Sequence, residues 1–268
     1  TPFSYHALKG VNLKIKDKSF TAIIGQTGSG KSTLIQHINA LLLPTSGEIN
    51  VDEFIITATD KPSKLKPLRK KAGLVFQFPE YQLFEETIEK DIIFGPMNFG
   101  VSEEEAKKIA RKVLKMVGLN ESYLSKSPFE LSGGQKRRVA IAGILAMDPD
   151  ILILDESTSM LDPKGKTEVN ALVKKIRQEK KMTVLSITHD IEEASQADRI
   201  ILLNRGRGEA IGGPKEILSD ANKLEELGLE APFSLQLSKQ LQNIGIDVSL
   251  YIDEKELVEE LCQLRLKK

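Results

Sequence analysis

A glycine-rich segment between an apolar run and an apolar helical pattern has the composition of a phosphate-binding loop. It reads Gly25-Gln26-Thr27-Gly28-Ser29-Gly30-Lys31-Ser32-Thr33 and follows the strand-like run at residues 20–24. Apolar residues at helical spacing continue from Leu34 to Leu42. Glycines let successive backbone N–H groups turn toward an anion, because a Cβ would block its close approach. The order of strand, glycine loop and helix predicts a site for the phosphates of a nucleotide and argues against a chance glycine-rich turn.

The residues of this loop have different expected tasks. Lys31 is expected to reach the β- and γ-phosphates, and Ser32 is expected to coordinate Mg²⁺. The other loop residues would surround the phosphates, while the positive N-terminus of the following helix faces them. These other residues are Gly25, Gln26, Thr27, Gly28, Ser29, Gly30 and Thr33.

Two adjacent carboxylates follow a second apolar run, at residues 151–154. This Ile-Leu-Ile-Leu run suits a strand covered on both faces, as in a parallel sheet. Asp155 then lies at the carboxyl end of the strand, where a second Mg²⁺ contact is expected. Glu156 is one residue further and, at strand spacing, faces elsewhere, so it is a candidate to polarise the water that attacks the γ-phosphorus. An acidic pair after a strand is weak evidence alone, and the phosphate loop in the same chain strengthens it.

A second glycine turn, Leu131-Ser132-Gly133-Gly134-Gln135, precedes another helical pattern. A serine hydroxyl and backbone N–H groups at a helix start form an anion site. One nucleotide does not need two such loops in one chain. We therefore expect Ser132, Gly133, Gly134 and Gln135 to cap the γ-phosphate held by a second subunit, and the alternative is a helix cap with flexible glycines.

These motifs, in this order, resemble the ATP-binding cassette family, the ATPase subunits of ABC transporters. The resemblance covers about residues 3–214 and implies ATP and Mg²⁺ as cofactors. It makes residues 25–33 a Walker A loop, residues 131–135 a signature motif and residues 151–155 a Walker B motif. The residues that it assigns to the metal ion are Ser32, Gln77 and Asp155.

The same resemblance implies further site residues. Glu156 would be the catalytic glutamate, and Asp162 would belong to a D-loop at the nucleotide. Gln77, after the strand-like run at residues 74–76, would contact Mg²⁺ or the attacking water and act as a hinge; by residue type alone it would be a surface glutamine. His189 would contact the γ-phosphate, although a lone histidine after a strand is more often structural.

The residue that stacks on adenine is expected near the N-terminus in this family. Phe3 and Tyr5 are both candidates.

A narrower resemblance is to the ATPases of energy-coupling factor (ECF) transporters, which import vitamins or transition-metal ions. The segments at residues 77–80, 82–87 and 95–100 resemble one of the two paralogous ATPases, whereas residues 155–162, residues 188–190 and the tail resemble the other. The resemblance implies a second ATPase subunit, a paralogue rather than a copy. It also implies a transmembrane coupling subunit, a substrate-binding membrane subunit and a peripheral position at the cytoplasmic face of the membrane.

Alternating strand and helix patterns predict an α/β fold with a mostly parallel sheet, and the resemblance makes this a P-loop NTPase core with a small antiparallel β part. Residues 1–214 would form the nucleotide-binding domain, with a helical subdomain inserted at about residues 79–147. Residues 61–71 are predicted to be an exposed connection, and residues 200–203 to be the last strand. Residues 215–268 are predicted to be a helical appendage that either docks on the partner ATPase as a dimerisation region or covers the core.

Composition limits the remaining possibilities. The 268 residues include 38 basic and 38 acidic side chains, so the formal net charge is zero and the chain lacks the basic excess typical of nucleic-acid binding. The single cysteine, Cys262, excludes an internal disulfide, and three scattered histidines do not suggest a metal cluster. No apolar stretch is long enough to span a bilayer. Two alternatives remain: a soluble cassette acting on nucleic acid or ribosomes, and a regulatory cassette that only binds nucleotide.

Overall fold

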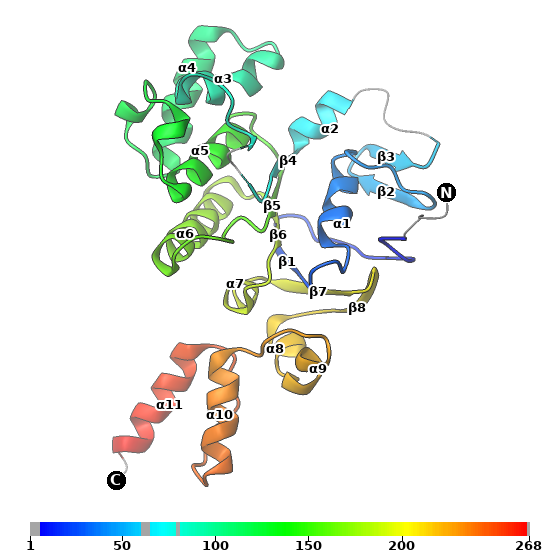
Figure 1. Ribbon diagram of the computed structural model, residues 1–268, viewed down its shortest axis with the longest axis vertical. Helices are drawn as coiled ribbons and strands as arrows, with labels where there is room; N and C mark the ends of the chain where they lie inside the picture. Colours follow the sequence, from blue (N-terminus) through cyan, green and yellow to red (C-terminus); the bar gives the residue numbers. More distant parts are fainter. Residues whose placement is uncertain (1–5, 60–64, 79–80, 267–268) are drawn as a thin grey trace. The chain divides into compact units, whose positions relative to one another are not determined.

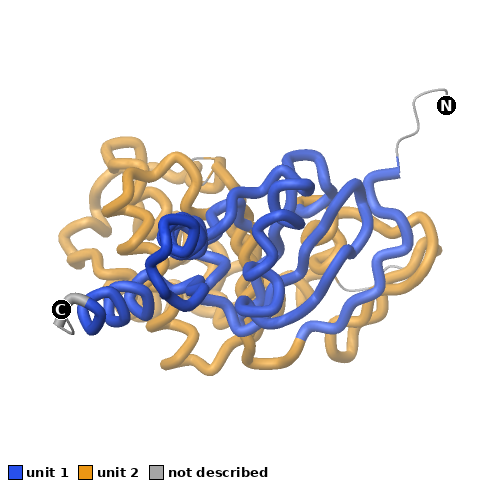
Figure 2. The backbone as a smooth tube through the Cα atoms, turned by 90° about the horizontal axis from the view of Figure 1, so that it is seen from below, with its two compact units in different colours: residues 1–15, 20–31, 188–268 blue, residues 16–19, 32–187 orange. Residues whose placement is uncertain are grey.

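The computed structural model describes residues 6–59, 65–78 and 81–266. Figure 1 shows the helices and strands in order along the chain, and Figure 2 colours the two compact units into which the chain divides. Unit 1 comprises residues 1–15, 20–31 and 188–268, and unit 2 comprises residues 16–19 and 32–187. Each unit has its own strands, helices and buried side chains, and each is described separately below.

Three neighbouring parallel strands lie in unit 2. They are β4 (Ala72–Val75), β5 (Ile151–Asp155) and β6 (Thr183–Ile187), in that order across the sheet. All three consist almost entirely of buried residues, as expected for strands covered on both faces. Val75 pairs with Leu154, and Asp155 pairs with Ile187. This register brings the carboxyl ends of the strands to one edge, and the residues that follow β4 and β5 meet there.

A helical block separates β4 from β5 in the sequence (Figure 1). It contains α3 (Ile88–Asn98), α4 (Glu103–Met116) and α5 (Gly133–Leu145), with two short 3₁₀ turns between α4 and α5. The predicted start of α4 is confirmed, because Ser102 Oγ accepts a hydrogen bond from Glu105 N at 3.4 Å. The predicted end is confirmed too: Gly118 follows with a φ of +74°.

The rest of unit 2 contains two elements that the sequence patterns did not indicate. β2 (Glu48–Val51) pairs antiparallel with β3 (Phe54–Thr57), and β3 was not predicted. The prediction of an exposed connection at residues 61–71 is wrong for its described part, where α2 (Leu65–Lys71) is a helix that buries Leu68 completely. One buried leucine in a basic segment is too weak a pattern to reveal a helix from sequence. The long helix α6 (Pro163–Lys180) has Asp162 as its N-cap.

Unit 1 contains β1 (Phe20–Ile24), which pairs in parallel with β7 (Arg199–Asn204). The prediction that residues 200–203 form the last strand is wrong, since β8 (Arg207–Gly212) pairs antiparallel with β7. The two-residue turn between these strands has positive φ at both positions, +46° at Arg205 and +82° at Gly206. This conformation suits a tight hairpin. The sequence Arg-Gly-Arg-Gly-Glu hides the second strand because its residue types have low strand propensity.

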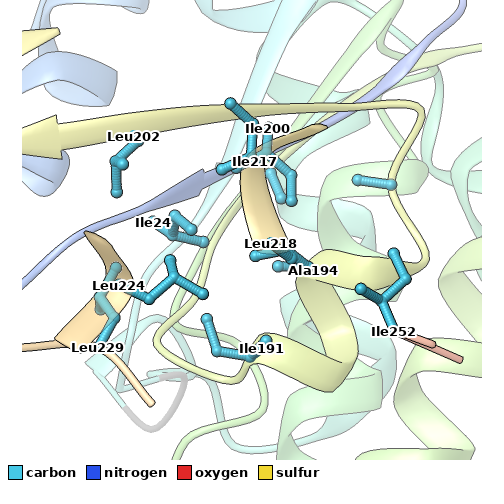
Figure 3. Packing of buried hydrophobic residues seen from close by; sticks show 12 residues of the cluster. Ile24, Ile191, Ala194, Ile200, Leu202, Ile217, Leu218, Leu224, Leu229 and Ile252 are labelled. Atoms are coloured by element: carbon cyan, nitrogen blue, oxygen red, sulfur yellow. The ribbon is translucent and has the colours of Figure 1, made fainter. Parts of the chain in front are cut away.

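The C-terminal segment of unit 1 contains α8 (Pro214–Leu218), α9 (Ala221–Glu226), α10 (Phe233–Asn243) and α11 (Glu254–Leu266). Figure 3 shows that its first part packs on the sheet of this unit: Ile217, Leu218 and Leu224 belong to one buried cluster with Ile24 and Leu202. Further members of the cluster include Ile191 and Ala194 of α7 (Ile191–Ser195), Ile200, Leu229 and Ile252. These residues of the C-terminal segment therefore cover the core of unit 1, which is one of the two roles predicted for residues 215–268.

The expected fold class is confirmed: mostly parallel strands, a small antiparallel pair, an inserted helical block and C-terminal helices. None of the described helices is both long enough and apolar enough to cross a bilayer.

Candidate active site

The phosphate-binding loop connects β1 to α1 (Lys31–Ile38), as predicted. Gly25 has a φ of +153°, and a Cβ there would lie 2.1 Å from Leu203 O of β7. Gly30 has a φ of +99°, and a Cβ there would lie 2.7 Å from Ala7 O. Both positions require glycine because the backbone is in a region that L-residues rarely adopt and because a main-chain oxygen occupies the space. Within unit 1, the main-chain oxygens of Leu203 and Ala7 therefore pack directly against the loop.

Two side chains of the loop are directed to its interior. Lys31 is 6% exposed, and its Nζ donates hydrogen bonds to Gly25 O at 2.7 Å and Gln26 O at 2.9 Å. Ser29 is 3% exposed, and its Oγ is buried without a hydrogen-bond partner among the described residues. A buried cation and a buried hydroxyl without a partner in the described part of the chain, both in a glycine-rich loop before a helix, fit an anionic ligand.

The predicted metal ligands lie in unit 2. Ser32 Oγ donates to Asp155 Oδ1 at 3.2 Å, although the two residues are 123 positions apart in sequence. Asp155, at the end of β5, is 6% exposed. A hydroxyl and a carboxylate are oxygen donors of the kind that Mg²⁺ prefers, so this pair fits the predicted metal site.

Gln77 and Glu156 are also neighbours. Gln77 Nε2 donates to Glu156 Oε2 at 2.7 Å. The prediction that Glu156 continues at strand spacing is wrong: its φ is +47°, in the left-handed region, so the chain leaves β5 in a sharp turn. The turn is stabilised because Glu156 O accepts hydrogen bonds from Ser159 N at 3.0 Å and from Ser159 Oγ at 2.7 Å. The turn presents the carboxylate of Glu156 beside Gln77 and at the same strand edge as Asp155.

The signature segment begins α5. Ser132 is the N-cap and forms a capping box, with Ser132 Oγ accepting from Gln135 N at 3.3 Å and Ser132 N donating to Gln135 Oε1 at 3.0 Å. Gly133 and Gly134 start the helix, and a Cβ on Gly133 would meet no atom within 4 Å. The simple-cap alternative therefore describes the geometry correctly, but the open first turn also leaves the backbone N–H groups of these glycines accessible to an anion.

His189 and Asp162 lie at the starts of two helices. His189 is exposed between β6 and α7 and belongs to unit 1. The next residue, Asp190, is the N-cap of α7, and its Oδ1 accepts hydrogen bonds from Glu192 N at 3.0 Å and Glu193 N at 3.2 Å. Asp162 caps α6 by accepting from Gly165 N at 3.2 Å. Asp162 therefore has a structural task that is sufficient to explain an aspartate at this position.

A cavity of about 500 Å³ opens beside the segment that follows Gln77. Its lining includes Gln82, Phe84, Asp91 and Phe94, together with residues of α2 and α5. Asp91 Oδ1 accepts from the backbone N–H groups of Phe84 and Glu85, both at 3.1 Å, whereas Asp91 Oδ2 is buried without a hydrogen-bond partner in the described part of the chain. Burial raises the pKa of the Asp91 carboxyl. This half-buried acceptor was not indicated by any sequence motif.

The predicted site residues thus form two groups. Unit 2 brings together Ser32, Asp155, Gln77 and Glu156 through two hydrogen bonds, and it also contains Thr33, Asp162 and residues 132–135. Unit 1 contains the loop at residues 25–31 and His189. Phe3 and Tyr5, the candidates for adenine stacking, lie outside the described residues.

Comparisons with known proteins assign the chain to a family. Residues 8–159 match the ABC transporter family, and residues 232–268 match the energy-coupling factor transporter EcfA1 C-terminal domain. The energy-coupling factor transporter ATP-binding protein EcfA2 of Geobacillus kaustophilus is 52% identical over 243 residues, which are 90% of this chain and 84% of that protein. The EcfA2 protein of Bacillus cereus is 49% identical over 270 residues, covering 100% of this chain and 92% of that protein.

Solved structures agree with this assignment. The structure of cbiO1 from Clostridium perfringens, part of the ABC transporter complex cbiONQ, has a TM-score of 0.74 and 38% identity over 90% of this chain and 91% of that one. The ATP-binding cassette MJ0796, in a dimeric post-hydrolysis state bound to ADP and Pi, has a TM-score of 0.70 and 39% identity over 78% of this chain and 90% of that one. The chain belongs to the ABC transporter family, as an ATPase of the energy-coupling factor type.

Proposed function

We propose that this chain hydrolyses MgATP to power an ECF-type importer for vitamins or transition-metal ions. The observation that carries the proposal is the hydrogen bond between Gln77 and Glu156, next to the Ser32–Asp155 pair at the end of β5. This arrangement provides a carboxylate for the attacking water and a separate oxygen pair for a metal ion. A cassette that only binds nucleotide does not need a carboxylate that orients the attacking water.

The chain's own groups would divide the reaction as follows. Lys31 would hold the β- and γ-phosphates, and backbone N–H groups of residues 25–31 would surround them. Ser32 and Asp155 would hold Mg²⁺, which neutralises the charge that develops on the transferred phosphoryl group. Glu156 would accept a hydrogen bond from the attacking water and orient it toward the γ-phosphorus, while Gln77 fixes the Glu156 carboxylate through Oε2. His189 would contact the γ-phosphate.

A second ATPase subunit would complete the site. The N-terminus of α5, with Ser132, Gly133 and Gly134, would bind the γ-phosphate of ATP held by the partner's phosphate loop. The two subunits would then close when ATP bridges them and separate after hydrolysis, because the bridging charge is lost. The names EcfA1 and EcfA2 both occur among the matches, which supports a paralogue as the partner. The exposed apolar side chains Ile244 and Val258 on the C-terminal segment are candidates for contact with it.

A membrane subunit would occupy the cavity beside α3. The printed description of cbiO1 as part of a complex supports membrane partners for this chain, and the same partners would hold it at the cytoplasmic face of the membrane. Asp91 Oδ2 lacks an intramolecular partner among the described residues, so we propose that the part of the membrane subunit that enters this cavity supplies a lysine or an arginine. Such a pair would be favourable because Asp91 Oδ2 is already buried without a partner in the described part of the chain, and because Oδ1 is already fixed by two backbone donors.

The experiment is a Glu156→Gln variant in the assembled transporter, compared with Glu179→Gln as a matched control. Glu179 lies on α6 and pairs only weakly with Lys175, at 3.9 Å. Because a general base contributes about 10²–10⁴-fold, Glu156→Gln should lower kcat by about that factor, retain ATP binding and accumulate a closed dimer. Phosphate release by Glu156→Gln at the wild-type rate would refute the role of Glu156, and so would equal losses in the two variants.

A further inference from the structure

Arg137 joins the main chains of the two residues proposed to act on water. It lies on α5, five residues beyond Ser132, and is 5% exposed. Its Nη1 donates to Glu156 O at 3.1 Å, and its Nη2 donates to Gln77 O at 3.2 Å. Because the side chains of Gln77 and Glu156 are themselves 2.7 Å apart, each of these residues is held both by its carbonyl and by its side chain.

A guanidinium group is suited to this position. Its planar fork presents several donors at fixed spacing, so it can hold two acceptors at once. Gln77 follows β4 and Glu156 follows β5, and the fork therefore fixes the distance between two chain segments that leave neighbouring strands. A lysine ammonium could reach one carbonyl but would not fix the relative position of both.

Stability alone does not explain a buried arginine here. Removing a permanent charge from water is unfavourable, and an apolar side chain of similar volume is often a more stable filler for an interior position. Glu156 also has the strained φ of +47°, which persists only where the surroundings impose it. Both points indicate that Arg137 serves the geometry of the catalytic turn.

We propose that Arg137 is a positioning residue that transmits the placement of the signature loop to the Gln77–Glu156 pair of the same chain. Arg137 is about 7.5 Å along the helix axis from Ser132, at 1.5 Å per residue. When the start of α5 binds a phosphate on the partner subunit and moves, the helical segment from Ser132 to Arg137 moves with it. The two hydrogen bonds of Arg137 then transmit this movement to the carbonyls of Gln77 and Glu156. The inference rests on the proposed function, since it takes Glu156 as the residue that orients water.

The test uses the assembled transporter with Arg137→Met and Arg137→Lys, each in the wild-type and the Glu156→Gln background. Arg177→Met is the control, since Arg177 also donates to a main-chain oxygen, Lys18 O at 3.4 Å, but from α6. Arg137→Met should lower kcat by about tenfold to a hundredfold, because a small misplacement of a reacting group is sufficient for such a loss. The equilibrium affinity for ATP should stay within about twofold, Arg137→Lys should give a smaller loss of kcat, and the control should match the wild type.

The double variant separates a positioning role from a general structural one. If Arg137 acts through Glu156, Arg137→Met adds little to the loss already produced by Glu156→Gln. The inference is overturned if the two losses multiply, if ATP affinity falls in parallel with kcat, or if Arg137→Met turns over at the wild-type rate. Should Arg137→Met not fold, Arg137→Lys retains the charge and is judged by the same three criteria. A wild-type rate for Glu156→Gln alone would instead refute the proposed function, whatever Arg137 does.

Discussion

Two glycines of the phosphate-binding loop make different demands on the chain, and this difference can be measured. Gly25 and Gly28 both have positive φ, +153° and +81°. A Cβ on Gly28 meets no atom within 4 Å, whereas a Cβ on Gly25 lies 2.1 Å from Leu203 O and 2.7 Å from Ser29 Oγ. Leu203 O belongs to β7, which pairs with β8 on one side and β1 on the other, so it cannot move without disturbing the strand pairing.

The magnitudes follow from these contacts. Gly28→Ala adds only backbone strain, about 1–2 kcal/mol for an L-residue in left-handed space. Gly25→Ala adds a comparable strain and, in addition, the overpacking of a main-chain oxygen, typically about 1–3 kcal/mol. The free energy of unfolding should therefore fall by about 1 kcal/mol in Gly28→Ala and by about 3 kcal/mol in Gly25→Ala. In a chain of this length each kcal/mol corresponds to roughly 2–4 °C in Tm.

The assay is urea unfolding of the purified chain without nucleotide, followed by equilibrium binding of ATP. Both variants should bind ATP more weakly, because either Cβ prevents the backbone N–H groups from approaching a phosphate closely. Only Gly25→Ala should lose substantial stability as well. Equal losses of stability in the two variants would refute the argument that Leu203 O sets the requirement for glycine at position 25, and wild-type ATP affinity in Gly28→Ala would refute the role of the loop.

Two further substitutions test charges outside the loop. Burial raises the pKa of the Asp91 carboxyl, so the protonated side chain stabilises the folded state at pH values below its ordinary pKa, and this contribution is lost as the pH rises past the raised value. In urea unfolding, Asp91→Asn should therefore gain more stability relative to the wild type at pH 8 than near pH 4. The same variant should bind the membrane partner at least about tenfold more weakly. Lys71 pairs with Asp52 at 2.9 Å, Glu53 at 3.3 Å and Asp150 at 3.4 Å, and these carboxylates raise the pKa of Lys71. The ammonium group therefore stays charged through neutral pH. Its contribution to the stability of the folded state is lost only at pH values above the ordinary pKa range of lysine. Lys71→Met should lose about 1 kcal/mol, constant between pH 7 and pH 9 and smaller in 1 M NaCl; a loss unaffected by salt would contradict the ion-pair explanation.

The sequence predicted the parts of the site that depend on short segments. The phosphate loop has its residues within nine consecutive positions, so its glycines and Lys31 were recognisable together. The strand that ends in Asp155 was predicted from its branched apolar run, and the strand before Gln77 was predicted at residues 74–76, whereas β4 spans Ala72–Val75. Parallel strands place their carboxyl ends at one edge, and for this reason the pairing of Ser32 with Asp155 could be expected from residues far apart in sequence.

The parts that were missed depend on contacts rather than on residue types. Arg137 lies in the run Lys136-Arg137-Arg138, which as a pattern indicates an exposed basic helix face, and only the fold reveals that one of the three is buried. The left-handed backbone of Glu156 could not be predicted, because nothing in a glutamate favours it and Ser159 and Arg137 impose it from outside. β8 was missed because pairing with β7, and not its own composition, makes residues 207–212 a strand.

Several groups that the sequence assigned to ligands already have partners within the protein, and this affects where affinity for ATP can arise. Lys31 Nζ donates to two backbone carbonyls, and Ser132 Oγ closes a capping box. A phosphate that binds these groups replaces existing hydrogen bonds, so the gain is the difference between two bonded arrangements. For Lys31 that difference is favourable, because a phosphate carries a charge opposite to that of the ammonium group, whereas the two carbonyls are neutral. For Ser132 the hydroxyl must be shared with the cap, so the backbone N–H groups of Gly133 and Gly134 should contribute more of the binding than the serine side chain.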